Sequence, residues 1–179
     1  LPTDRSFRAY RAAAAPWLVV QRVAHSDRSI AASFAKDDLD GGAAGLSFVQ
    51  RTSHLAYGSG VDLTQADTLE AILEDVRFEA ILLRLEGEPT GRAAAHLIRL
   101  LRRKAAFLST TLDVDFGLDP VGAFAAGESI DVESSLRAGM ELLKERPDAR
   151  LFAADGRPYH AAGASEAQEL AAVLSTALV

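Results

Sequence analysis

Residues 78–85 read F-E-A-I-L-L-R-L, a short apolar run of the kind that forms a buried β-strand. Four similar runs lie elsewhere in the chain, at Trp17–Val23, Gly45–Val49, Ala105–Leu112 and Ala149–Ala154. Most of them are continuously apolar rather than alternating, which is typical of strands buried on both faces of a parallel sheet. The runs begin about 33 residues apart on average, which is the length of one βα unit.

Helical patterns fill the gaps between these runs. Residues 64–76 carry an apolar stripe at helical spacing, and a last helix is expected to turn Leu170 and Leu174 inward. The expected N-caps are Ser26 or Asp27, Thr90, Asp119, Asp131 and Ser165. The alternation of strands and helices predicts the α/β class, with a parallel βα repeat and right-handed crossovers.

Two architectures fit about five βα units. One is an open doubly wound sheet of flavodoxin-like shape, and the other is part of an eight-unit (β/α)₈ barrel of the TIM type. A whole barrel usually needs about 250 residues, more than the 179 present. We expect a single domain over residues 1–179. Strand order separates the two, because sequential neighbours indicate a barrel and a reversal indicates a doubly wound sheet.

Composition excludes several classes of function. A formal net charge of −6 and a pI near 5.2 give no support for a nucleic-acid partner. The absence of cysteine excludes disulfides, thiolate zinc sites and cysteine nucleophiles. No apolar run approaches the roughly 20 residues of a membrane span. We therefore expect a cytoplasmic protein with no membrane partner.

The segment 155–165 is the strongest candidate site. It follows a predicted strand and ends at a helix N-cap, so it lies at the carboxyl edge of the sheet, where parallel α/β proteins bind ligands. Tyr159 and His160 can donate hydrogen bonds there or act as an acid. The alternative is a tight turn that contains a hydrogen-bonded histidine.

Other polar groups have simpler explanations. Asp113, Asp115 and Asp119 follow the fourth predicted strand and could hold a hard cation, but Asp119 is already explained as a cap, and no metal site is predicted. His25 and His54 follow the first and second strands as loop residues, and His96 lies on a helix surface. The basic cluster of Arg99, Arg102, Arg103 and Lys104 closes a helix, where cations complement the dipole. Its alternative is a phosphate site for a nucleotide or acyl-coenzyme A.

Four segments together resemble the N-terminal barrel domain of methylmalonyl-CoA mutases. They are Pro16-Trp17, residues 42–47 (G-A-A-G-L-S), Gly117–Pro120 (G-L-D-P), and Tyr159–Leu170, which reads Y-H-x-x-G-A-x-x-x-Q-E-L with one residue fewer between His160 and Gly163 than the family segment. The resemblance implies a (β/α)₈ barrel threaded by the pantetheine arm of coenzyme A. It also implies a radical rearrangement between methylmalonyl-CoA and succinyl-CoA, with adenosylcobalamin held by a second domain through a D-x-H-x-x-G motif.

The resemblance is greatest to the small (beta), non-catalytic chain of this family. Catalytic chains carry a tyrosine where Arg22 stands, a substrate-contacting glutamine in the stretch matched by Gly117-Leu118-Asp119, and a substrate arginine where Gly127 stands. The active-site histidine after a tyrosine is retained as His160, beside Tyr159. The alternative is therefore an active acyl-CoA mutase chain with altered substrate contacts.

The resemblance also implies cofactors and partners. The D-x-H-x-x-G motif is absent, so we expect this chain to bind no cofactor, and adenosylcobalamin to belong to the full family enzyme. The expected partners are the catalytic large mutase chain or further copies in a homo-oligomer, with acyl-CoA as a potential ligand. Because the repeat stops after five units, we expect a segment of a longer protein.

Overall fold

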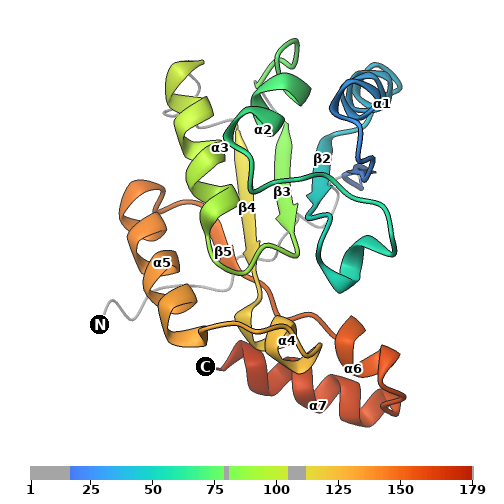
Figure 1. Ribbon diagram of the computed structural model, residues 1–179, viewed down its shortest axis with the longest axis vertical. Coiled ribbons are helices and arrows are strands. Elements are labelled where there is room, and N and C mark those ends of the chain that lie inside the picture. Colours follow the sequence, from blue (N-terminus) through green and yellow to red (C-terminus); the bar gives the residue numbers. More distant parts are fainter. Residues whose placement is uncertain (1–16, 79–80, 105–111, 179) are drawn as a thin grey trace.

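A computed structural model describes residues 17–78, 81–104 and 112–178 (Figure 1). Five strands alternate with helices along the chain. The strands are β1 (Val20–Val23), β2 (Gly45–Val49), β3 (Leu82–Glu86), β4 (Asp113–Leu118) and β5 (Arg150–Phe152). The helices are α1 (Arg28–Asp40), the 3-10 helix η1 (His54–Ala56), α2 (Ala66–Ile72), α3 (Arg92–Arg103), α4 (Pro120–Ala125), α5 (Val132–Glu145), α6 (Arg157–Ala161) and α7 (Glu166–Ala177). Within the described ranges, no helix combines the length and apolarity needed to cross a bilayer.

The five strands form one parallel sheet in chain order, β1-β2-β3-β4-β5. This confirms the predicted α/β class with a parallel βα repeat, and it confirms the predicted strand order. A doubly wound sheet reverses its order at one point. This sheet does not, so the open flavodoxin-like alternative is wrong.

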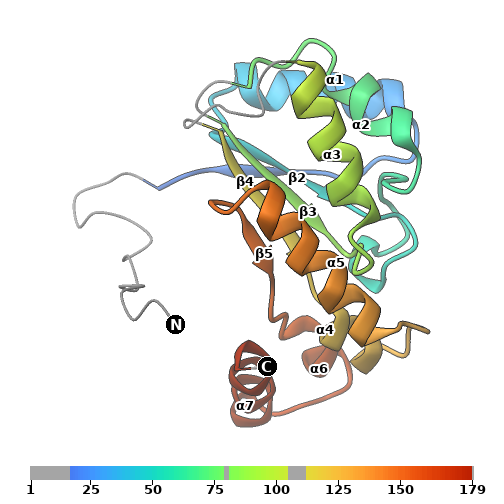
Figure 2. The same ribbon diagram turned by 90° about the vertical axis from the view of Figure 1, so that its left-hand side faces the viewer.

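The two faces of the sheet differ in chemistry. Helices α1, α2, α3 and α5 all lie on one side of it (Figure 2). The strand side chains at the centre of the core are Leu46, Phe48, Leu83, Leu85, Val114 and Phe116. Residues that alternate with these form a polar row across the whole sheet, in register: Arg22, Ser47, Arg84, Asp115 and Arg150. A polar row therefore crosses the other face, whereas bulky branched residues fill a typical barrel interior.

The fourth strand lies later in the chain than predicted. Residues 105–111 of the predicted run fall outside the described residues, and the observed strand is Asp113–Leu118. Val114, Phe116 and Leu118 are buried there, and they alternate with Asp113 and Asp115. Asp113 and Asp115 thus lie within the strand rather than after it, so the acidic group expected after the strand is not assembled.

The helix N-termini follow local sequence signals. Asp27, Asp119 and Asp131 accept hydrogen bonds from backbone N–H groups of the first helical turn, and Ser165 forms a capping box with Gln168. Thr90 is not the cap of α3. Gly91 occupies that position with φ 81°, and the buried Glu88 carboxylate accepts the Ala93 N–H in its place.

Helix α7 lies beyond the carboxyl ends of the strands with α4 and α6 (Figure 1). None of its residues is buried, and Leu170 and Leu174 are 59% and 55% exposed. The prediction that these leucines turn inward is therefore wrong. Their helical spacing is right, but α7 packs through the neighbouring face that contains Glu169, Ala172, Val173 and Thr176.

Candidate functional site

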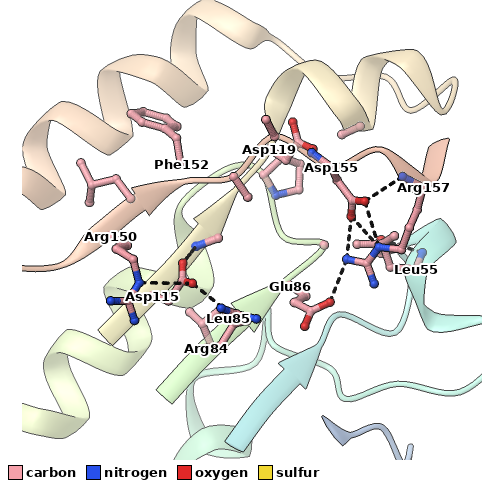
Figure 3. Close-up of a pocket in the computed structure, with 18 of the residues that line it drawn as sticks. Leu55, Arg84, Leu85, Glu86, Asp115, Asp119, Arg150, Phe152, Asp155 and Arg157 are labelled. Atoms are coloured by element: carbon pink, nitrogen blue, oxygen red, sulfur yellow. Dashed lines mark hydrogen bonds and ion pairs between the residues drawn. The ribbon is translucent and has the colours of Figure 1, made fainter. Parts of the chain in front are cut away.

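A cavity of about 820 Å³ lies at the carboxyl edge and polar face of the sheet. Strands β3, β4 and β5 contribute Arg84, Asp115 and Arg150 of the polar row, and residues after the strands contribute His54 and Arg157. Figure 3 shows Arg84 and Arg150 converging on Asp115, while Arg157 reaches toward the end of β3. The cavity therefore joins the sheet face to the start of α6.

Ion pairs fill the polar row. The Arg84 Nε atom donates to Asp115 Oδ2 at 3.0 Å, and Arg150 Nε lies 3.6 Å from the same oxygen. Arg150 also pairs with Asp113 at 3.0 Å. The other Asp115 oxygen accepts the Gly117 N–H at 3.1 Å. These charges neutralise one another, so the row does not present an unpaired charge to the cavity.

Arg157 makes the most extensive contacts at the edge. Its guanidinium donates two charge-assisted bonds to Asp155, Nε to Oδ1 at 2.9 Å and Nη2 to Oδ2 at 2.6 Å, and a third to Glu86 Oε2 at 3.0 Å. Burial acts to raise the pKa of Asp155, but the hydrogen bonds from Arg157 outweigh it and lower that pKa. Hydrogen bonds to Asp155 and Glu86 raise the pKa of Arg157, although burial opposes this.

His54 is the histidine that lines the cavity. Its Nδ1 lies 3.1 Å from Glu128 Oε1, and its buried Nε2 makes no hydrogen bond within the described residues. Asp119, also at the cavity, accepts the backbone N–H groups of Gly122 at 2.7 Å and Asp155 at 3.0 Å. Burial raises the pKa of Asp119, and these two hydrogen bonds only partly offset it.

The sequence-predicted pair lies elsewhere. Tyr159 and His160 belong to helix α6, and neither is among the described residues that line the cavity. The His160 side chain is 77% exposed, and its Nδ1 lies 3.2 Å from Glu169 on α7. A catalytic role for Tyr159 and His160 therefore stays a prediction.

The other sequence candidates are accounted for by local contacts. His25 accepts the Asp27 N–H at 3.0 Å, and burial lowers the pKa of His96 on α3. Around the basic cluster, Arg102 pairs with Glu145, Arg103 with Glu70 at 2.6 Å, and Lys104 with the Glu74 carbonyl at 2.8 Å. Across the described ranges, no group of three His, Asp or Glu side chains is placed to hold a metal ion.

Three positions singled out by the family resemblance have distinctive geometry. Arg22 donates to the Leu55 carbonyl, and its guanidinium lies 5.8 Å from the Tyr57 ring centroid. Gly117 has φ 54°, and a Cβ atom there would overlap the carbonyl oxygen of Leu85. Gly127 has φ 85° with open space around it. Both glycines have positive φ angles, which residues with a side chain rarely adopt.

Sequence reasoning missed three charged residues of the cavity wall, Arg84, Glu86 and Arg150, which lie within predicted apolar strands or directly after one. Arg157 lies in the predicted segment 155–165, but no role was predicted for it. The available signal for the first three was their alternation with buried residues, which places charges on one face of a strand.

Comparison with curated proteins relates the chain to a mutase subunit. No family model matches the chain. The chain is 33% identical over 164 residues to the methylmalonyl-CoA mutase small subunit of Streptomyces virginiae, and this match covers 89% of the chain. It spans 25% of that protein's length.

Proposed function

Because the chain is a relative of the methylmalonyl-CoA mutase small subunit, we propose that it is a non-catalytic barrel segment that supports a catalytic large mutase chain. The reaction in question is the adenosylcobalamin-dependent isomerisation of methylmalonyl-CoA and succinyl-CoA. In this proposal the large chain supplies the cofactor and the substrate contacts, and the present chain supplies a rigid βα framework.

Gly117 is the observation that carries the proposal. The resemblance matches a substrate-contacting glutamine to the Gly117-Leu118-Asp119 stretch. At Gly117 the left-handed backbone and the neighbouring Leu85 carbonyl leave no room for any side chain. At Gly127, where a substrate arginine is expected, φ 85° likewise favours glycine. The local backbone therefore disfavours, at both positions, the side chains that the family resemblance places there.

The cavity wall supports the same proposal. Arg84 donates to Asp115, and Arg150 pairs with Asp113 and lies 3.6 Å from Asp115. An arginine that orients a substrate carboxylate needs donors directed at the ligand, whereas these are directed at Asp115. His160, the retained family position, is paired with Glu169 away from the cavity.

The residues present do not fit adenosylcobalamin as a bound cofactor. The family motif supplies a histidine to the cobalt, and His54 is the histidine at this cavity. Its Nδ1 is engaged by Glu128 and its Nε2 is buried, so neither nitrogen is presented to an incoming metal. We therefore assign the cofactor to another chain or domain and derive no step through it.

A second candidate is an acyl-CoA mutase chain with altered substrate contacts. The observation that favours it is the cavity of about 820 Å³ at the carboxyl edge, which has both guanidinium and apolar walls, the latter including Phe152 and Leu143. A cavity of this size and mixed lining suits a small-molecule ligand.

An isomerisation assay separates the two candidates. Purified chain is mixed with adenosylcobalamin and methylmalonyl-CoA, and a mutase of known activity serves as the positive control. The scaffold proposal expects no succinyl-CoA above the no-protein blank. Turnover that His160→Ala abolishes would overturn it and favour the second candidate.

A further inference from the structure

Helices α6 and α7 form a unit with little buried surface. Within α6 only Pro158 is buried, and no residue of α7 is buried. The leucine stripe of α7 is exposed along its length. Burial of apolar area is the main force that fixes helices in place, so it holds this unit weakly. Within the unit, Glu169 of α7 contacts His160 of α6, and Gly163 makes the turn between them.

A polar bridge ties this unit to the sheet. Arg157, the first residue of α6, crosses to Glu86 at the end of β3, a partner 71 positions away in sequence. The second Glu86 oxygen accepts the Ser47 hydroxyl at 2.5 Å, which fixes the carboxylate against β2. Asp155, in the chain just before α6, also pairs with the Arg157 guanidinium.

The two acids of the bridge are mostly buried, whereas its arginine is partly exposed to solvent. The side chains of Glu86 and Asp155 are 18% and 13% exposed, whereas that of Arg157 is 44% exposed. Water therefore reaches the guanidinium, and an ion pair in this setting is weaker than a buried one. The preceding backbone is anchored, because Asp119 accepts the Asp155 N–H.

We propose that the α6–α7 unit is a lid that closes the cavity at its carboxyl edge, where Gly156 and Arg157 line it, and that the Arg157–Glu86 bridge is the latch that holds the lid closed. Gly156 marks the hinge, since the chain is anchored at Asp155 and Pro158 is the one buried residue of the two helices that follow. Opening moves the unit away from α4, which α6 contacts, and leaves the five-stranded sheet intact. Local openings of weakly packed elements are common in stable domains. This inference goes beyond the proposed function and does not depend on it.

Cysteine labelling tests the latch, because the chain contains no cysteine of its own. Ala123→Cys places a thiol on α4 at a cavity position that is 5% exposed. Ala94→Cys places one in the core of α3, where labelling requires global unfolding. Each probe is combined with Arg157→Met, and the rate of reaction with dithiobis(nitrobenzoate) is measured under native conditions.

Loss of three charge-assisted bonds is expected to raise the labelling rate at position 123 by about tenfold or more and to leave position 94 unchanged. Glu86→Gln, a milder change, is expected to give a smaller increase at position 123 alone. Arg137→Met, which removes an exposed pair with Glu133, is the matched control and changes neither rate. An unchanged rate at 123, or equal increases at both probes, would overturn the proposal.

Discussion

Arg84 and Asp115 are joined across neighbouring strands, with the guanidinium Nε 3.0 Å from the carboxylate on the polar face of the sheet. Asp115 also faces Arg150 on its other side. One carboxylate of β4 therefore neutralises a guanidinium on each flanking strand. This arrangement turns a face that is apolar in most barrels into a set of paired charges.

Removing the central charge should destabilise the sheet. Asp115→Asn keeps the shape of the side chain but leaves two guanidiniums without their shared counter-charge. We expect urea denaturation to show a loss of about 2 kcal/mol in the free energy of unfolding. Asp113→Asn removes a more exposed partner of Arg150 and is expected to cost about 0.5 kcal/mol. Equal losses from the two variants would contradict the central position of Asp115.

The two glycines at family site positions should respond differently to alanine. At Gly117 a Cβ atom meets the Leu85 carbonyl as well as an unfavourable φ, so Gly117→Ala is expected to cost at least about 2 kcal/mol. At Gly127 only the φ is unfavourable, and Gly127→Ala is expected to cost about 1 kcal/mol. Thermal unfolding monitored by circular dichroism measures both. A smaller loss of stability at Gly117 than at Gly127 would contradict this, because it would mean that the Leu85 carbonyl moves aside at little cost.

The acids at the cavity should contribute to stability with opposite pH dependence. Arg157 lowers the pKa of Asp155 despite its burial. The stability from Asp155 is therefore present above about pH 4 and is lost as the pH falls through the lowered value. Burial raises the pKa of Asp119. As the pH falls toward 4, the Asp119 carboxyl is therefore protonated in the folded state before it is protonated in the unfolded state, and the free energy of unfolding rises.

Urea titrations at several pH values separate these contributions. The stability difference between the wild-type chain and Asp155→Asn should shrink as the pH falls below about 4. As the pH falls from neutral to about 4, the wild-type chain should gain free energy of unfolding relative to Asp119→Asn. A pH-independent difference for either variant would contradict the assigned pKa direction.

We expect the chain to self-associate, because an apolar helix face and two sheet edges are exposed. The stripe of Leu170, Leu174 and Leu178 on α7 is exposed, and β1 and β5 are edge strands of the described sheet. Sedimentation equilibrium at micromolar concentration should show a dimer or larger species. Leu174→Glu should weaken it, whereas Ser175→Glu, an exposed position off the stripe, should not. A single species near 19 kDa for the wild-type chain would contradict this expectation.

Local signals in the sequence predicted most of the fold. Asp27, Asp119 and Ser165 mark helix starts through bonds within a few residues, and such signals can be read directly. Strand order followed from the regular spacing of apolar runs, because short right-handed crossovers place successive strands side by side.

Long-range pairing explains what could not be predicted. Asp113 and Asp115 resemble loop residues until Arg84 and Arg150, 31 and 35 positions from Asp115, supply their counter-charges within the sheet. Arg157 is likewise ordinary in sequence, because its role depends on Glu86, which is 71 positions away. The predicted segment 155–165 and the cavity lie at the same edge of the sheet, but the cavity wall depends on pairs that a single sequence does not reveal.

Binding to a catalytic large mutase chain tests the scaffold role most directly. The chain is titrated into a purified large chain, and sedimentation equilibrium at micromolar concentration measures the mass of the complex. The proposal predicts a defined complex that contains both chains, and turnover that depends on the large chain alone. Two species that sediment independently at every ratio would contradict it.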